Sequence, residues 1–142
     1  MRLASLAFAL VLAAGAAQAA VTATDAWVRG TVAAQKVTGA FVTLESTEDS
    51  KLVAVSTPAA ASAEIHASED RNGVMHMHAI ETVALPAGRR VELKPGSFHI
   101  MLVGLTRALS AGDQVALTFT IEDRQGRRTR LEVRAEVRPL GR

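Results

Sequence analysis

The sequence predicts an all-β protein that folds as an antiparallel sandwich of about nine short strands. Apolar residues recur at every second position and are mostly β-branched or bulky, which is typical of strands with one buried face. Glycine, proline, asparagine and aspartate interrupt these segments at short intervals, as turns do. Strands that each bury one face close most simply as two packed sheets, so we expect a β-sandwich.

The clearest strands are the last two. A segment from Val115 to Ile121 alternates apolar and polar residues, and Asp123 to Gly126 forms a turn. Apolar and charged residues alternate again from Thr129 to Val137, and we interpret the charged side as a solvated sheet face. Earlier strands are expected near Val21–Val28, Gly39–Glu45, Leu52–Val55, Ala63–Ala67, Val74–Thr82, Arg90–Leu93 and Phe98–Leu102.

The first nineteen residues, MRLASLAFALVLAAGAAQA, predict a cleaved export signal. Arg2 precedes an apolar run, and Ala17-Gln18-Ala19 is a small-residue ending of the kind that signal peptidase cleaves. Residues 20–142 are then expected to form a single periplasmic domain with no membrane anchor after cleavage. The chain has no cysteine, so neither a lipid-anchored cysteine nor a disulfide is expected. The net charge is only +2 and the basic residues are spread out, which argues against nucleic acid as a partner.

Histidine and methionine gather in one stretch of the chain. All four histidines and all three methionines after the initiator fall between positions 66 and 101. A single methionine is usually core filler and a single histidine is usually a surface residue, but the clustering of both types favours a metal site. The residues are His66, Met75, His76, Met77, His78, His99 and Met101.

The Asn-Gly pair at 72–73 predicts a two-residue hairpin turn, which fixes the register of the strands beside it. This register places His66 and Met77 on one face, as diagonal neighbours about 7–8 Å apart between backbone positions. His76 and His78 point to the opposite face. A three-residue loop would reverse these faces, because a slip of one residue turns every side chain over.

The second half of the expected site is the segment 98–102. Phe98 and the apolar residues two and four positions after it are expected on the core side, so His99 and Met101 project together from the other side. If this strand lies beside the hairpin, one set of four ligands forms near the sandwich surface: His66, Met77, His99 and Met101.

The chemistry of the donor atoms indicates the metal. Thioether sulfur is soft and uncharged and suits Cu(I), whereas zinc sites are built from thiolate, imidazole and carboxylate. A blue-copper electron-transfer centre needs a cysteine thiolate and is not expected. His76 and His78 are candidates for a weaker second site, for Cu(II), or are solvent-facing residues with no ligand role. Met75 is a candidate auxiliary ligand, although we favour a role as a shield against solvent.

The spacing of these residues resembles the signature of a known family, the periplasmic copper chaperones called PCuAC. That signature is a histidine, ten residues, a methionine, twenty-one residues and then His-x-Met, which His66, Met77, His99 and Met101 match. The segments DAWVRGTVAAQKVTGAFVTLES, EIHASEDRNGVMHMHAIE and FHIMLVGLTRALSAGDQVALTFTIEDRQG are also similar to the family. The resemblance implies a cupredoxin-like, immunoglobulin-like sandwich that binds Cu(I) through those four residues. It also implies copper supply to the CuA subunit of cytochrome c oxidase, directly or with a Sco-type thioredoxin-fold protein.

Other functions remain open at this point. General periplasmic copper buffering or tolerance would use the same site. A copper-dependent redox enzyme would need an open metal position with a catalytic partner, and none stands out, so the chain is not expected to be an enzyme. A purely structural sandwich predicts that loss of Met77 and Met101 leaves metal affinity unchanged. Glu64, Glu69 and Asp70 are interpreted as residues that keep the hairpin soluble.

Overall fold

A computed structural model of the chain describes residues 19–140. The predicted signal peptide, residues 1–19, therefore lies outside the described residues apart from Ala19. The described part forms ten strands and confirms the all-β prediction. They are β1 (Val21–Arg29), β2 (Val37–Ser46), β3 (Ser50–Ser56), β4 (Ala60–Arg71), β5 (Val74–Ile80), β6 (Val83–Leu85), β7 (Arg90–Leu93), β8 (His99–Leu105), β9 (Gln114–Asp123) and β10 (Arg128–Arg138).

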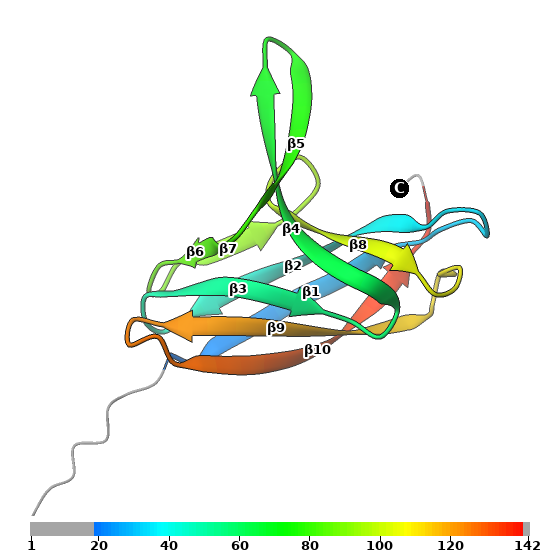
Figure 1. Cartoon of the computed structure of the whole chain (residues 1–142). Helices are drawn as coiled ribbons and strands as arrows, with labels where there is room; N and C mark the ends of the chain where they lie inside the picture. The colour runs from blue at the N-terminus through cyan, green and yellow to red at the C-terminus, as the bar shows by residue number, and fades with distance from the viewer. Residues whose placement is uncertain (1–18, 141–142) are drawn as a thin grey trace, which may run out of the picture.

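The strands hydrogen-bond in one continuous order, β5-β4-β8-β2-β1-β10-β9-β3-β6, and β7 pairs with β2. This path folds over on itself (Figure 1), so that β3, β9 and β10 form one layer and β4, β8 and β2 form the other. The paired strands are antiparallel except β1 and β10, which are parallel. The predicted sandwich is thus present, with one parallel pair in it.

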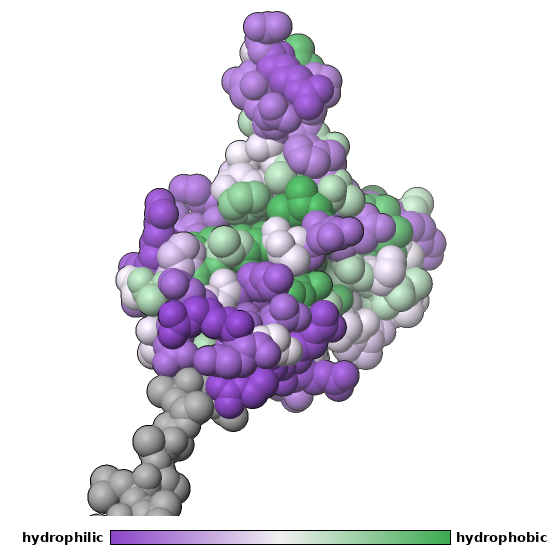
Figure 2. Space-filling model, turned by 60° about the vertical axis from the view of Figure 1, so that its left-hand side comes forward, coloured by the Kyte–Doolittle hydropathy of each residue, from purple (hydrophilic) through white to green (hydrophobic). Residues whose placement is uncertain are grey.

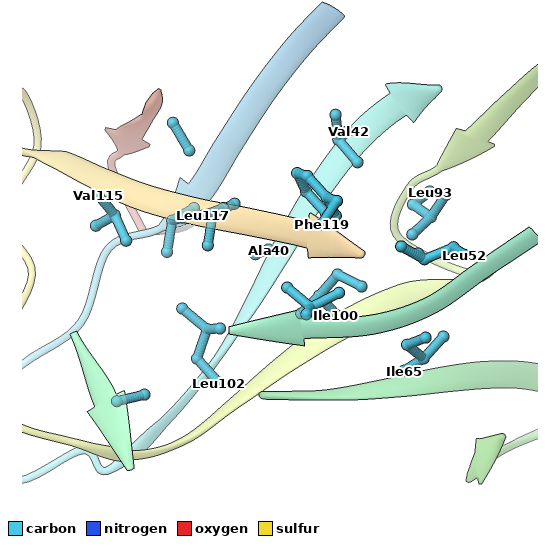
Figure 3. Close-up of a cluster of buried hydrophobic side chains, with 14 of the residues drawn as sticks. Ala40, Val42, Leu52, Ile65, Leu93, Ile100, Leu102, Val115, Leu117 and Phe119 are labelled. Carbon is cyan, nitrogen blue, oxygen red and sulfur yellow. The ribbon is translucent and has the colours of Figure 1, made fainter. Parts of the chain in front are cut away.

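The core lies between the two layers. Leu117 and Phe119 of β9 point toward Ile100 and Leu102 of β8 (Figure 3), and all four side chains are fully buried. Burial of such a side chain contributes about 1.5–3 kcal/mol, so these contacts are the main source of stability. They also commit Ile100 and Leu102 to the core and leave His99, Met101 and Val103 for the outer face.

A β-bulge in β1 decides which of its side chains face outward. The pairing with β2 shifts by one residue between Thr24 and Trp27, and Asp25 within this segment has a positive φ of 51°. Odd-numbered residues pack against the core before the bulge, and even-numbered residues do so after it. The extra residue therefore turns Trp27 and Arg29 to the outer face, on the same side of the sheet as the odd-numbered residues of β8.

The β4–β5 hairpin projects beyond the body of the sandwich (Figure 1). Asn72 and Gly73 both have positive φ, 55° and 80°, as a two-residue hairpin turn requires. His66 pairs with Ala79, so the predicted register is confirmed. The residues of β5 from Val74 to Ala79 are all exposed. Figure 2 shows the hairpin as a mainly hydrophilic projection above a body that carries hydrophobic residues near its base.

Three details differ from the sequence predictions. A tenth strand, β6, forms directly after the expected end of the strand Val74–Thr82. It pairs with β3, and its residues Val83 and Leu85 are buried. Phe98 was expected on the core side and is instead 38% exposed, because β8 begins only at His99. The parallel pairing of β1 with β10 joins distant parts of the chain, which local alternation of residues does not reveal.

The part of the chain that the structure describes contains no helix of the length and hydrophobicity that crossing a bilayer requires.

Candidate metal site

Strands β4 and β8 are direct neighbours and bring the two predicted histidine ligands together. His66 of β4 pairs with His99 of β8, and Glu64 pairs with Met101 in the same ladder. Residues that pair across antiparallel strands share a face, so all four lie on the outer side of this layer. The centroids of the two imidazole rings are 5.7 Å apart. The structure thus brings His66, His99 and Met101 together on two adjacent strands, which is the condition on which the expected set of four ligands depended.

His99 is buried, with only 4% of its surface exposed. Its Nδ1 lies 2.9 Å from the backbone oxygen of Ser97, and since that oxygen only accepts, Nδ1 carries the proton and donates it. The lone pair is then on Nε2, which is buried and has no hydrogen-bond partner among the described residues. The set of four was expected near the sandwich surface; His99 lies on the outer side of its layer, but its own side chain is covered. A buried imidazole nitrogen without a partner is unfavourable unless a ligand engages it.

His66 is held through its other ring nitrogen. Its Nε2 lies 2.8 Å from Oε2 of Glu64, which is two residues earlier on the same face of β4. A carboxylate only accepts, so Nε2 is the donor and Nδ1 carries the lone pair. Glu64 was expected only to keep the hairpin soluble, and instead it orients a predicted ligand. Such carboxylate–histidine pairs are common behind metal-binding imidazoles.

Met77 and Met101 line one pocket of about 260 Å³ together with His99. Met101 reaches the pocket from β8, and Met77 reaches it from the projecting hairpin, where its side chain remains 61% exposed. His66 is not among the lining residues of this pocket. It belongs to the candidate site because it pairs with His99 on the neighbouring strand. Ser68 pairs with Met77, and its Oγ is the other buried side-chain polar atom without a hydrogen-bond partner in the described chain.

The auxiliary candidates lie farther from this centre. Met75 lies on the same face as Met77, two residues nearer the hairpin tip. It is exposed and does not line the pocket. His76 and His78 lie on the opposite face, where they pair with Glu69 and Ala67. The structure therefore does not bring these three residues into the four-residue cluster.

Sequence reasoning missed a group of aromatic and basic residues beside the site. The ring of Phe41 lies 6.5 Å from that of His99 and 4.4 Å from that of Trp27, and the Arg29 guanidinium is 5.5 Å from the Phe41 ring. Gly39 makes room for this arrangement, because a Cβ there would lie 2.8 Å from the Phe41 ring. The one signal of this group in the sequence is the single tryptophan, Trp27.

The cluster fits one soft metal ion. Two imidazoles bound to one ion through bonds of about 2.0 Å have centroids roughly 4.5–6.5 Å apart, and the observed separation lies in that range. The other two donors are thioethers, so all four ligands are neutral and the set favours a soft monovalent ion. Among residues 19–140, no three His, Cys, Asp or Glu side chains are grouped so as to hold a metal.

The fold and the site define a class: a small β-sandwich domain with two histidines and two methionines gathered on one outer face. Comparison with known proteins agrees with this class. Residues 21–137 match the model of the family described as "Putative lipoprotein LpqE-like". The chain belongs to this family, and the predicted membership of the PCuAC group is confirmed.

Two curated relatives are similar over most of the chain. One is the putative lipoprotein Lxx21020 of Leifsonia xyli subsp. xyli, 32% identical over 72% of this chain and 63% of the relative. The other is the uncharacterized protein RP573 of Rickettsia prowazekii, 35% identical over 75% of this chain and 62% of the relative. The chain thus spans less than two thirds of the length of these relatives.

Two solved structures have a similar fold. The apo PCuAC domain from PmoF1 has a TM-score of 0.67 at 21% identity, and the match covers 84% of this chain and 93% of that domain. The Cu(I) form of DR1885 from Deinococcus radiodurans has a TM-score of 0.57 at 30% identity, with 80% of this chain and 74% of that chain covered.

Proposed function

We propose that this protein is a periplasmic metallochaperone that binds one Cu(I) ion through His66, Met77, His99 and Met101. The observation that carries the proposal is the Nε2 of His99, which is buried without a partner beside a second histidine and two thioethers. Imidazole and thioether together suit Cu(I) better than zinc or a hard cation. The structural relative DR1885, which is described in a Cu(I) form, supports copper as the ion.

Binding and release follow from the unequal exposure of the ligands. His99 and Met101 are fixed on a strand whose other face is committed to the core, so they form the rigid half of the site. Met77 lies on an exposed hairpin strand and is the ligand that an acceptor can reach first. Stepwise replacement of Met77, then His66, and finally His99 and Met101 would transfer copper without unfolding of the sandwich.

The acceptor is proposed from the family resemblance. We infer delivery to the CuA site of cytochrome c oxidase, directly or together with a Sco-type thioredoxin-fold protein. The signal-like segment at the N-terminus and the lipoprotein description of the family support an exported protein. The role proposed is that of a carrier rather than an enzyme.

The test of metal binding is an anaerobic Cu(I) titration of residues 20–142 against a chromophoric chelator. The wild type should bind one equivalent, and the Met77→Ala/Met101→Ala double variant should lose at least about 100-fold in affinity, since two of four ligands are removed. Met75→Ala is the matched control, because it removes an exposed methionine of the same hairpin face. Equal affinity of the wild type and the double variant would rule the site out.

General copper buffering is the second candidate function, because it needs the same four residues. Mixing the Cu(I)-loaded protein with an apo CuA domain separates the two functions. Transfer faster than dissociation into free solution supports a chaperone, and transfer limited by dissociation supports a buffer. A weaker Cu(II) site at His76 and His78 is a further candidate, since both imidazoles are exposed on one face of β5. Its test is loss of a second Cu(II) equivalent in the His76→Ala/His78→Ala variant.

A further inference from the structure

We propose that Arg29 is an anion-docking residue at the mouth of the metal site, and that it receives the anionic copper ligand of the molecule that exchanges copper with this protein. The ligand chemistry is a group that is negatively charged and binds Cu(I), such as a thiolate or a chelator carrying acidic groups. The inference rests on the proposed function and deepens it by assigning the chemistry of the exchange partner.

The position of Arg29 is built into the fold. The bulge near Asp25 turns Arg29 to the outer face, and its backbone oxygen accepts a hydrogen bond of 2.7 Å from the Thr38 hydroxyl. The guanidinium lies over the Phe41 ring, which also neighbours His99. Arg29 therefore lines the same pocket as His99, Met77 and Met101.

Arg29 is also the only side chain with a permanent charge in that pocket. Apart from the three expected ligands, the other lining residues are polar but uncharged, small or apolar: Gln35, Val37, Thr38, Gly39, Phe41, Pro95 and Gly96. The guanidinium has no carboxylate within 4.0 Å among residues 19–140. Its charge is thus free to attract an anion that enters the pocket.

A second arginine on the same face shows the contrast. Arg138 stacks on Trp27 at 4.9 Å, as Arg29 does on Phe41, but Arg138 also donates to Asp25 at 2.6 Å. Arg138 therefore has a carboxylate partner and Arg29 has none among the described residues, although both guanidiniums stack on neighbouring aromatic rings. The unpaired arginine is the one in the pocket.

Charge explains why this placement suits exchange rather than storage. Cu(I) bound by two imidazoles and two thioethers keeps a charge of +1, so a nearby guanidinium repels it. An incoming anion removes this repulsion, because it pairs with the guanidinium and supplies a negative ligand to the copper. Arginine in a pocket with apolar walls also raises the local concentration of anions and their rate of association.

The experiment is stopped-flow transfer of Cu(I) from the loaded protein to two related chelators, the anionic bathocuproine disulfonate and the uncharged neocuproine. Arg29→Gln should slow transfer to the anionic chelator by about tenfold at low salt and leave transfer to the neutral chelator unchanged. Arg29→Lys should keep most of the rate, since it keeps the charge. Arg134→Gln, which removes an exposed arginine of β10 outside the pocket, should change either rate by less than about twofold.

Salt provides a measurement on the unaltered protein. Raising the ionic strength from about 0.01 M to 1 M should reduce the advantage of the anionic chelator in the wild type, because it shortens the screening length from about 30 Å to 3 Å. Equal slowing of both chelators by Arg29→Gln, or no slowing of either, would overturn the inference. If the wild type binds no Cu(I) at all, the proposed function itself fails, so the two failures are distinguishable.

Discussion

The two faces of strand β8 differ in what they do for the molecule. Ile100 and Leu102 point inward against β9 and are fully buried among apolar neighbours (Figure 3). His99 and Met101 point outward, where one imidazole nitrogen is buried without a partner. The inner face stabilises the fold. The outer face carries a buried nitrogen without a hydrogen-bond partner, and the core supplies enough stability for the protein to fold despite it. Because the inner side chains of β8 are held in the core, the strand also holds the two expected metal ligands on its outer face in place.

Ile100→Ala is expected to give the largest effect on the inner face. Removing this fully buried side chain should lower the free energy of unfolding by about 2–5 kcal/mol, through lost burial and the cavity left behind. Urea denaturation monitored by circular dichroism measures it. The Cu(I) affinity of the fraction that remains folded should stay within about threefold of the wild type, since no ligand changes. A loss of affinity in proportion to the loss of stability would mean that the two faces are not separable.

His99→Leu is expected to give the reverse result on the outer face. Cu(I) affinity should fall by at least about 100-fold, more than the change typical when only an outer partner of a ligand is lost. The free energy of unfolding of the metal-free protein should change by less than about 1 kcal/mol, because a buried nitrogen without a partner disappears together with one hydrogen bond. Competition titration and urea denaturation of the same sample measure both. A severe loss of stability would contradict the separation of roles.

Glu64→Ala tests the carboxylate that orients His66. Cu(I) affinity should fall by about 10- to 100-fold, the range typical for outer partners of metal-binding histidines, because the ring loses the acceptor of its Nε2 proton. Glu64→Gln keeps an acceptor oxygen and should retain most of the affinity. Glu69→Ala is the matched control on the same strand, since its carboxylate forms an ion pair with Arg71 and lies on the face opposite to His66. Tighter binding in Glu64→Ala would mean that Glu64 competes with copper for His66.

Asp113→Asn, in the connection between β8 and β9, is expected to give the smallest effect. The backbone N–H of Ser110 and the side chain of Arg107 hold the pKa of Asp113 below its ordinary value. A lowered pKa in the folded state stabilises the protein above the unfolded pKa, about 3.9, and this contribution is lost as the pH falls through the lower folded value. The variant should therefore melt slightly below the wild type at pH 7, and the gap should close in acid. A gap that is constant with pH would contradict this account.

Local sequence signals predicted on which strand faces most residues of the candidate site lie. The Asn72-Gly73 turn fixed the hairpin register, because positive φ at both residues permits only one tight geometry. Alternation in β8 correctly placed His99 and Met101 on the side away from Ile100. These features depend on residues close together in the chain, and the period of two converts position directly into face.

The parts that could not be predicted depend on contacts between distant segments. No local pattern reveals that β8 lies between β4 and β2, or that β1 pairs in parallel with β10. The burial of His99 depends on segments outside its own strand, so the alternation within β8 could not predict it. Arg29 and Phe41 join the site only because strands far apart in sequence lie side by side, and Glu64 was visible in the sequence but its partner was not.

The bulge in β1 marks the one place in this strand where a change of length is expected to be tolerated. Asp25 and Ala26 together stand opposite the single Val42 of β2, while Thr24 pairs with Thr43 and Trp27 pairs with Phe41. Deleting one of these two residues would keep both sets of pairs, so Trp27 and Arg29 would stay on the outer face. Deleting Val28 would instead move Arg29 opposite the buried Ala40 and turn it toward the core, so a scan of single-residue deletions should find Asp25 and Ala26 more tolerant than Val28.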